Sequence, residues 1–180
     1  SLFMAVTRTL LRSVADKSKS TADIVSSMNK TLSFNNESNM FVTFFLAILD
    51  TKTGLLKYCN AGHNPPVLIK HDGRAEFFNI TKSIPVGLFE DYVYSEEKTL
   101  IDPGDQLFLY TDGVTEAEDI EDNLYGNDQL IKVIRENTAL SPKLLIEQVN
   151  KDIARHVNGH IQSDDLTMLS IICYGTGSKL

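Results

Sequence analysis

The sequence has little of what marks disulfide-rich, membrane or nucleic-acid-binding proteins. Its two cysteines, Cys59 and Cys173, both lie in apolar segments, so we expect buried thiols in a reducing cytosol, not a disulfide framework or a zinc site. No apolar run approaches the length of a membrane span, and no secretory leader is apparent, because Arg8 and Arg12 lie inside an apolar helical pattern. The chain has only 17 basic residues and 24 acidic ones, and this excess of negative charge argues against a nucleic-acid partner. These absences predict a cytoplasmic protein with no membrane segment in this chain.

Several common enzyme signatures are also missing. There is no glycine-rich phosphate loop followed by lysine, no Gly-x-Ser-x-Gly elbow and no His-Glu-x-x-His motif. The acidic stretch that follows residue 115 does not fit an EF-hand. Counted from Asp119, the sixth position is Leu124 and the twelfth is Leu130, where that loop needs glycine and glutamate. A solvated loop is the better interpretation.

The order of helical and strand-like patterns predicts an antiparallel α+β domain. Apolar residues at helical spacing alternate with β-rich runs that are separated by turn residues. Helices grouped in pairs around strands joined by hairpins indicate α+β, not a doubly wound α/β sheet. We expect helices at residues 2–15, 20–36, 127–136 and 141–156, and strands at residues 41–49, 55–60, 67–70, 75–79, 92–100, 106–111 and 166–174.

Carboxylates stand at the ends of two apolar strands. One strand stops at Asp112 and Gly113, and the last strand is entered through Asp164 and Asp165. If the two strands are antiparallel neighbours, the end of one lies beside the start of the other. Mg²⁺ and Mn²⁺ prefer such oxygen ligands. Taken alone, an Asp-Gly turn or an Asp-Asp strand entry is also an ordinary structural feature.

A third feature is the loop "NAGHNPP", which contains Asn60 and His63. A histidine in a Gly/Pro-rich loop can act as a general acid, a phosphate contact or a metal ligand. It is equally consistent with a structural turn, although loops on rigid scaffolds often carry function. The residues themselves leave both interpretations open.

Five segments together resemble a known family. In order they read "FVTFFLAILDTKTGLLKYCNAGHNPPVLI", "IPVGL", "LIDPGDQLFLYTDGVTEA", "YGNDQL" and "SDDLTMLSI". They are similar to the SpoIIE/RsbU-type phosphatases, a bacterial branch of the metal-dependent (type 2C, PPM) Ser/Thr protein phosphatases. The resemblance extends from Leu2 to Cys173, which is nearly the whole chain.

The resemblance implies a β-sandwich flanked by helix pairs, in α-β-β-α layers. It also implies a two-metal Mn²⁺ or Mg²⁺ centre that hydrolyses phosphoserine or phosphothreonine on a phosphorylated partner-switching protein, such as an antagonist of an anti-sigma factor. By motif, Asp112 and Asp164 match metal-binding aspartates, with Asp165 beside them. Gly113, Asn60 and His63 are candidate neighbours of the site. No catalytic residue beyond the metal ligands is expected in this chain.

The chain departs from the family pattern at its start. The family's first strands carry an early acidic motif and a Gly-Asp-Val-type motif whose aspartate bridges the two metals, and neither occurs here. We therefore expect residues 1–174 to be the C-terminal portion of a phosphatase domain, inactive alone, followed by a tail at residues 175–180. Unpaired sheet edges would favour a homodimer. A pseudophosphatase that binds a partner without turnover is the main alternative, and a metal-independent small-molecule domain is a third.

Overall fold

The computed structural model describes residues 2–15, 20–34, 36–37, 39–160 and 164–174. The chain divides into two compact units. The first combines Ser1–His63 with Ile80–Leu100, and the second combines Asn64–Asn79 with Ile101–Leu180. Among the described residues, no helix has both the length and the apolar character needed to span a bilayer. The single domain expected over residues 1–174 stays a prediction, and the expected tail lies outside the described residues.

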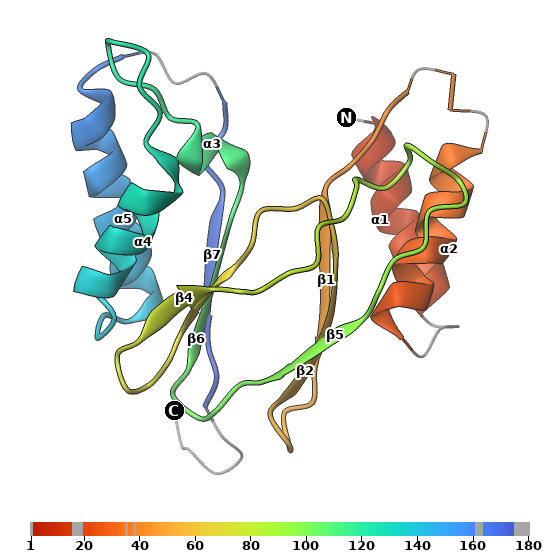
Figure 1. Ribbon diagram of the computed structural model, residues 1–180, viewed down its shortest axis with the longest axis horizontal. Coiled ribbons are helices and arrows are strands. Elements are labelled where there is room, and N and C mark those ends of the chain that lie inside the picture. The colour runs from red at the N-terminus through yellow and green to blue at the C-terminus, as the bar shows by residue number, and fades with distance from the viewer. Residues whose placement is uncertain (1, 16–19, 35, 38, 161–163, 175–180) are drawn as a thin grey trace. The chain divides into compact units, whose positions relative to one another are not determined.

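The first unit is a helix pair packed on a three-stranded antiparallel sheet (Figure 1). The sheet has the order β1-β2-β5, and α2 packs against β2 with α1 beside it. The apolar stripes read from the sequence account for this packing, since Ile24, Val25 and Met28 of α2 are buried with Cys59 of β2. The elements are α1 (Leu2–Ala15), α2 (Thr21–Ser33), β1 (Phe44–Leu49), β2 (Leu55–Ala61) and β5 (Glu97–Leu100).

Polar contacts fix both ends of α2. At its N-terminus, Ser20 Oγ accepts from the Asp23 N–H at 3.0 Å and so caps the helix. In its second half, the fully buried Asn29 holds a loop that is distant in sequence and precedes β5. Its amide donates to the Phe89 carbonyl at 2.7 Å and accepts from the Gly87 N–H at 2.9 Å. A helix residue thereby fixes the backbone of the "IPVGLFE" segment.

The second unit is a four-stranded antiparallel sheet with the order β4-β3-β6-β7. Helices α4 and α5 lie on one face of it (Figure 1). The buried core between helices and sheet includes Phe108, Leu130, Ile134, Leu145 and Ile153. The elements are β3 (Val67–Ile69), β4 (Ala75–Phe77), β6 (Gln106–Tyr110), α3 (Asp112–Thr115), α4 (Gly126–Glu136), α5 (Pro142–Val157) and β7 (Met168–Ile172).

The predicted fold class is confirmed, with three local corrections. The strand expected at residues 92–100 begins only at Glu97, because Tyr94 turns its ring into the core beside α2 and its hydroxyl donates to Pro85 O at 3.2 Å. The strand expected from residue 41 begins at Phe44. Directly after β6 the chain forms the single-turn helix α3, where an Asp-Gly turn was expected.

Candidate functional site

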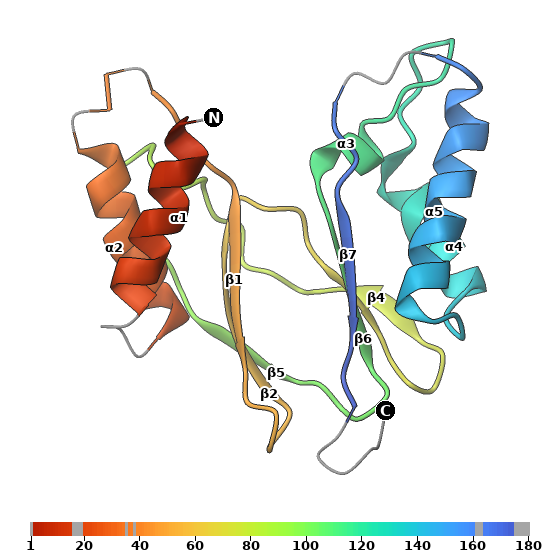
Figure 2. The same cartoon turned by 180° about the vertical axis from the view of Figure 1, so that it is seen from behind.

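The two strands that carry the candidate carboxylates are neighbours. β6 and β7 pair antiparallel, with Tyr110 opposite Met168. Asp112 begins α3 after Thr111, and Asp164 lies shortly before β7, so both lie at the same end of the strand pair. Figure 2 shows α3 at the end of the pair where β7 begins. The antiparallel pairing that the sequence-based expectation required is therefore present. Whether these aspartates are metal ligands stays a prediction.

Threonine 111 ties the two strand ends together. Its backbone N–H donates to Thr167 O at 3.0 Å, which adds a further ladder bond beyond β6 and β7. Its hydroxyl donates to the Asp165 carbonyl at 3.3 Å and accepts from the Thr167 N–H at 3.2 Å. These three bonds fix the backbone on one side of Asp112 against the entry to β7.

Glycine 113 makes the close approach on the other side of Asp112. A Cβ atom built at this position would lie 2.6 Å from Asp165 O and 3.5 Å from the carbonyl carbon of Asp164. A side chain would therefore have to displace backbone, and glycine is needed for the close approach. The candidate neighbour Gly113 thus has a definite structural role beside both aspartates.

The donor set suits a hard divalent cation. Asp112, Asp164 and Asp165 are all exposed, so their carboxylates remain open to ions and water. Local bonds orient two of them: Asp112 Oδ1 accepts from the Gly113 N–H at 3.1 Å, and Asp164 Oδ1 from the Asp165 N–H at 2.7 Å. In the described part of the chain the three do not form a group with all donor atoms within 4.8 Å, so further ligands would be needed for a complete centre.

Two other groups of donors do meet within 4.8 Å. One comprises His71, Asp102 and Asp105, but Lys70 Nζ already lies 3.0 Å from Asp102 Oδ2 and 2.8 Å from Asp105 Oδ2. The ammonium group therefore supplies the positive charge there. The other group comprises Glu118, Asp122 and His160, at the surface of the same unit.

Asp105 is a buried carboxylate that the sequence did not single out. It accepts from Lys70 Nζ at 2.8 Å, from the Asp102 N–H at 2.9 Å and from the His71 N–H at 3.0 Å. Burial opposes its ionisation, but these hydrogen bonds outweigh burial and lower the pKa of the carboxyl below its usual value. Asp105 thereby fixes the start of β6 to the β3–β4 turn.

The candidate residues Asn60 and His63 belong to the first unit. Asn60 closes their loop: its Nδ2 donates to His63 O and its Oδ1 accepts from the His63 N–H, both at 2.9 Å. Gly62 has a positive φ of 73°, and a Cβ there would lie 2.8 Å from Pro85. The His63 ring lies 6.4 Å from that of Phe45, centroid to centroid. Asn60 therefore has a structural role, and a catalytic role for His63 stays a prediction.

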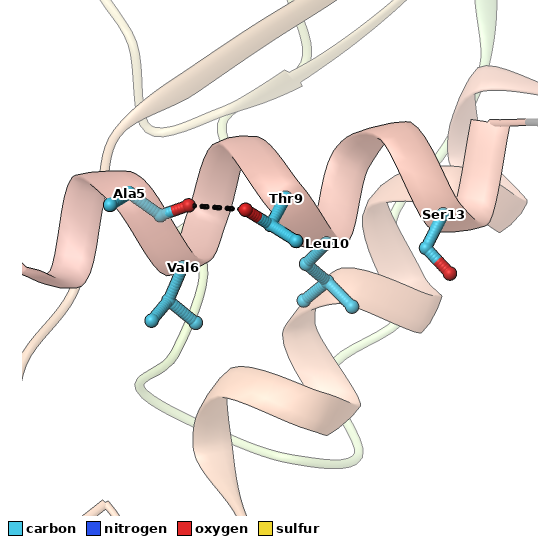
Figure 3. Close-up of a pocket in the computed structure, with 5 residues that line it drawn as sticks. All are labelled: Ala5, Val6, Thr9, Leu10 and Ser13. Carbon is cyan, nitrogen blue, oxygen red and sulfur yellow. Dashed lines mark hydrogen bonds between the residues drawn. The ribbon is translucent and has the colours of Figure 1, made fainter.

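Among the hollows lined by described residues, two have similar volumes. One, of about 430 Å³, lies along α1 and is lined by Ala5, Val6, Thr9, Leu10 and Ser13 (Figure 3). Its lining has no charged group, so it does not suit a phosphate or a metal. The other, of about 420 Å³, is lined by Tyr125, Gln129, Asp152, Arg155 and His156. There the Tyr125 hydroxyl and Gln129 amide donate to Asp152 Oδ2, at 2.9 and 2.8 Å.

Sequence reasoning missed Thr111, which shapes the candidate site, and Asp105, a buried carboxylate at the opposite end of β6. A signal existed for Thr111, because a hydroxyl residue stands directly before the Asp-Gly pair. No local signal existed for Asp105, since an aspartate in an Asp-Pro-Gly-Asp turn is ordinarily solvated. Its donors include Lys70 and His71, which are distant in sequence.

Comparison with known proteins gives consistent matches. The family described as Stage II sporulation protein E (SpoIIE) matches residues 1–173. The phosphoserine phosphatase RsbU of Bacillus subtilis is 22% identical over 168 residues, which cover 93% of this chain and 50% of that protein. The chain spans between 20% and 50% of the length of the curated relatives it matches.

Solved structures show the same fold. A crystal structure of the RsbU and RsbW domains of a Mycobacterium tuberculosis protein has a TM-score of 0.76 and 20% identity, and the match covers 97% of this chain and 48% of that one. The manganese-presoaked phosphatase domain of Bacillus subtilis SpoIIE has a TM-score of 0.67 and 16% identity, over 97% and 76% of the two chains. The phosphatase-type fold implied by the sequence resemblance is therefore confirmed.

Proposed function

Because the chain belongs to the SpoIIE family, we propose that it forms part of a metal-dependent protein phosphatase that hydrolyses phosphoserine or phosphothreonine. The substrate we propose is a phosphorylated partner-switching protein in the cytoplasm, of the kind that antagonises an anti-sigma factor. The observation that carries the proposal is the close backbone approach of Gly113, next to Asp112, to Asp164 and Asp165 at one end of the β6–β7 pair. Carboxylates fixed on neighbouring strands are a rigid base for metal ligands.

The chemistry assigns separate tasks to the metals and to the chain. Bound Mn²⁺ or Mg²⁺ ions supply an activated water and neutralise the charge of the phosphoryl oxygens. Asp112, Asp164 and Asp165 would hold the ions through carboxylate oxygens. Gly113 and Thr111 keep the two backbone segments in contact, which limits the spread of carboxylate positions. No covalent intermediate on the protein is required.

We expect the 180-residue chain by itself to show little or no turnover. Its described residues bring together the backbone of two strand ends, but the donor atoms of the three carboxylates do not all lie within 4.8 Å of one another. A two-metal centre needs more oxygen ligands than this arrangement offers. Activity should therefore be measured on the full-length protein.

The decisive variants are Asp112→Asn and Asp164→Asn in the full-length protein. Removing a ligand charge should lower Mn²⁺-dependent hydrolysis of p-nitrophenyl phosphate and of a phosphoserine peptide by about 100-fold or more, since metal stabilisation supplies several kcal/mol. Asp128→Asn is a matched control, because Asp128 is an exposed aspartate of the same unit, on α4. Unchanged turnover in Asp112→Asn would refute the proposal. Tight phosphoprotein binding without phosphate release, in the wild-type protein, would favour the pseudophosphatase alternative.

A homodimer is also proposed. β7 is an outer strand of its sheet, with Leu169 and Ile171 53% and 50% exposed. An outer strand with apolar side chains favours association with a second chain. Sedimentation velocity of the full-length protein at several concentrations tests this, and a monomer throughout would contradict it.

A further inference from the structure

The hydroxyl of Thr111 is used in an unusual way for its position. Thr111 is the N-cap residue of α3, where a threonine hydroxyl ordinarily accepts from an N–H of its own helix. Here it makes no such capping bond. It contacts Asp165 O at 3.3 Å and the Thr167 N–H at 3.2 Å instead. The side chain therefore joins two distant segments and does not serve its own helix.

These contacts bracket the proposed ligands. Asp112 lies between Thr111, which bonds to Asp165 O, and Gly113, where a Cβ would lie 2.6 Å from the same oxygen. On the segment before β7, Asp164 directly precedes Asp165, whose carbonyl accepts this bond. The carbonyl oxygen of Asp165 therefore lies next to both residues that flank Asp112, and it belongs to the segment that carries Asp164 and Asp165.

We propose that Thr111 is a positioning residue for the metal site, and that its hydroxyl sets the spacing between Asp112 and the Asp164–Asp165 pair. The inference rests on the proposed function of these aspartates. Groups that orient metal ligands without touching the metal commonly change metal affinity or activity by about 10- to 100-fold when they are removed. Thr111 meets this description, because its hydroxyl bonds to the backbone of a ligand segment.

A second side-chain bond between β6 and β7 serves as a control. It distinguishes a positioning role of Thr111 at the metal site from a general role in holding the two strands together. Gln106, at the opposite end of β6, donates through Nε2 to Oγ of Ser170, in the middle of β7, at 2.7 Å. This is also a side-chain bond between the two strands, but it lies away from the carboxylates. If any cross-strand bond supported metal binding equally, Ser170→Ala would weaken binding as much as loss of the Thr111 hydroxyl.

The experiment compares Thr111→Val, Thr111→Ser and Ser170→Ala in the full-length protein. Valine keeps the β-branched shape without the hydroxyl, and serine keeps the hydroxyl. Mn²⁺ affinity is measured from the electron paramagnetic resonance signal of free Mn²⁺, and kcat and KM for p-nitrophenyl phosphate are measured at saturating Mn²⁺. We expect Thr111→Val to weaken Mn²⁺ binding about 10-fold, with kcat largely restored at saturating Mn²⁺. Thr111→Ser and Ser170→Ala should bind Mn²⁺ like the wild type.

Each other outcome is informative. Unchanged Mn²⁺ affinity in Thr111→Val would overturn the inference, and so would equal weakening in Ser170→Ala. If the valine variant does not fold, Thr111→Ala is measured in its place with the same expectation. Absence of Mn²⁺ binding and turnover in the wild-type protein would overturn the proposed function itself, and this failure is recognised without any variant.

Discussion

Replacing Asp105 by asparagine removes a buried charge from the centre of a hydrogen-bond network. The carboxylate has no exposed area, and its contacts come from donors: the ammonium of Lys70, the backbone N–H groups of His71 and Asp102, and the His71 ring at 3.2 Å. An asparagine has one acceptor oxygen, so its NH₂ group would have to face at least one of these donors. The substitution therefore leaves Lys70 without its buried partner.

The expected loss of stability in Asp105→Asn depends on the contacts that Lys70 keeps. Breaking one side of a buried ion pair typically costs about 3–5 kcal/mol. Lys70 is partly exposed and keeps Asp102 at 3.0 Å, so we expect the lower end, about 3 kcal/mol. In a protein of this size each kcal/mol lowers Tm by about 2–4 °C. Asp105→Asn should thus lower Tm by about 6–12 °C.

The pH dependence has a definite sign. The folded-state pKa of Asp105 is lowered, so it lies below the value of about 3.9 for an unfolded aspartate. The carboxylate's stabilisation is therefore present above the unfolded pKa and is lost as the pH falls through the folded pKa. The difference in stability between wild type and Asp105→Asn should be constant near neutral pH and shrink below about pH 4.

Urea unfolding followed by circular dichroism, from neutral pH to about pH 3, measures both effects. Asp102→Asn is the matched control, because Asp102 bonds to the same ammonium but is 53% exposed. An exposed pair contributes about 0–1 kcal/mol, so this variant should be nearly neutral. A loss below about 1 kcal/mol in Asp105→Asn, or a difference that grows at acidic pH, would refute the reasoning.

Three further changes test other parts of the structure. Gly113→Ala would place a Cβ 2.6 Å from Asp165 O, so we expect a stability loss of about 1–3 kcal/mol and weaker Mn²⁺ binding; full affinity would contradict the close approach. Asn29→Ala leaves buried backbone groups unpaired, which should cost about 1–3 kcal/mol and speed amide exchange at Gly87, and unchanged exchange there would count against it. Burial raises the pKa of the Cys59 thiol to about 12, so Ellman's reagent should modify it only after unfolding; rapid labelling of the folded protein would disagree.

The sequence predicted the strand ends well because both signals there are local. An apolar strand that ends in a carboxylate is visible in a short window, and the β6–β7 pairing then places Asp112 beside Asp164. The cap at Ser20 is local in the same sense, because it joins residues three apart in the sequence.

The errors arose where distant contacts decide the local structure. Tyr92 and Tyr94 stand two residues apart, as on one face of a strand, yet their rings pack edge to face at 4.8 Å between centroids, in the cluster around α2. α3 is a single turn, too short to show a helical period. The buried state of Asp105 depends on a hairpin turn far from it in sequence. No pattern confined to a few residues contains that information.

The pairing of β6 with β7 also has a consequence for folding. Residues 113–163 separate Asp112 from Asp164 in the sequence, so the two strand ends come together only when a long loop has closed. By polymer statistics, closure of a loop of this length costs roughly 3–4 kcal/mol of chain entropy, and such non-local pairing forms slowly. Docking of α5 against β7 must compensate for that loss. Anything that loosens β7 should therefore weaken the apparent affinity for metal in proportion to the fraction of molecules in which the strand is undocked.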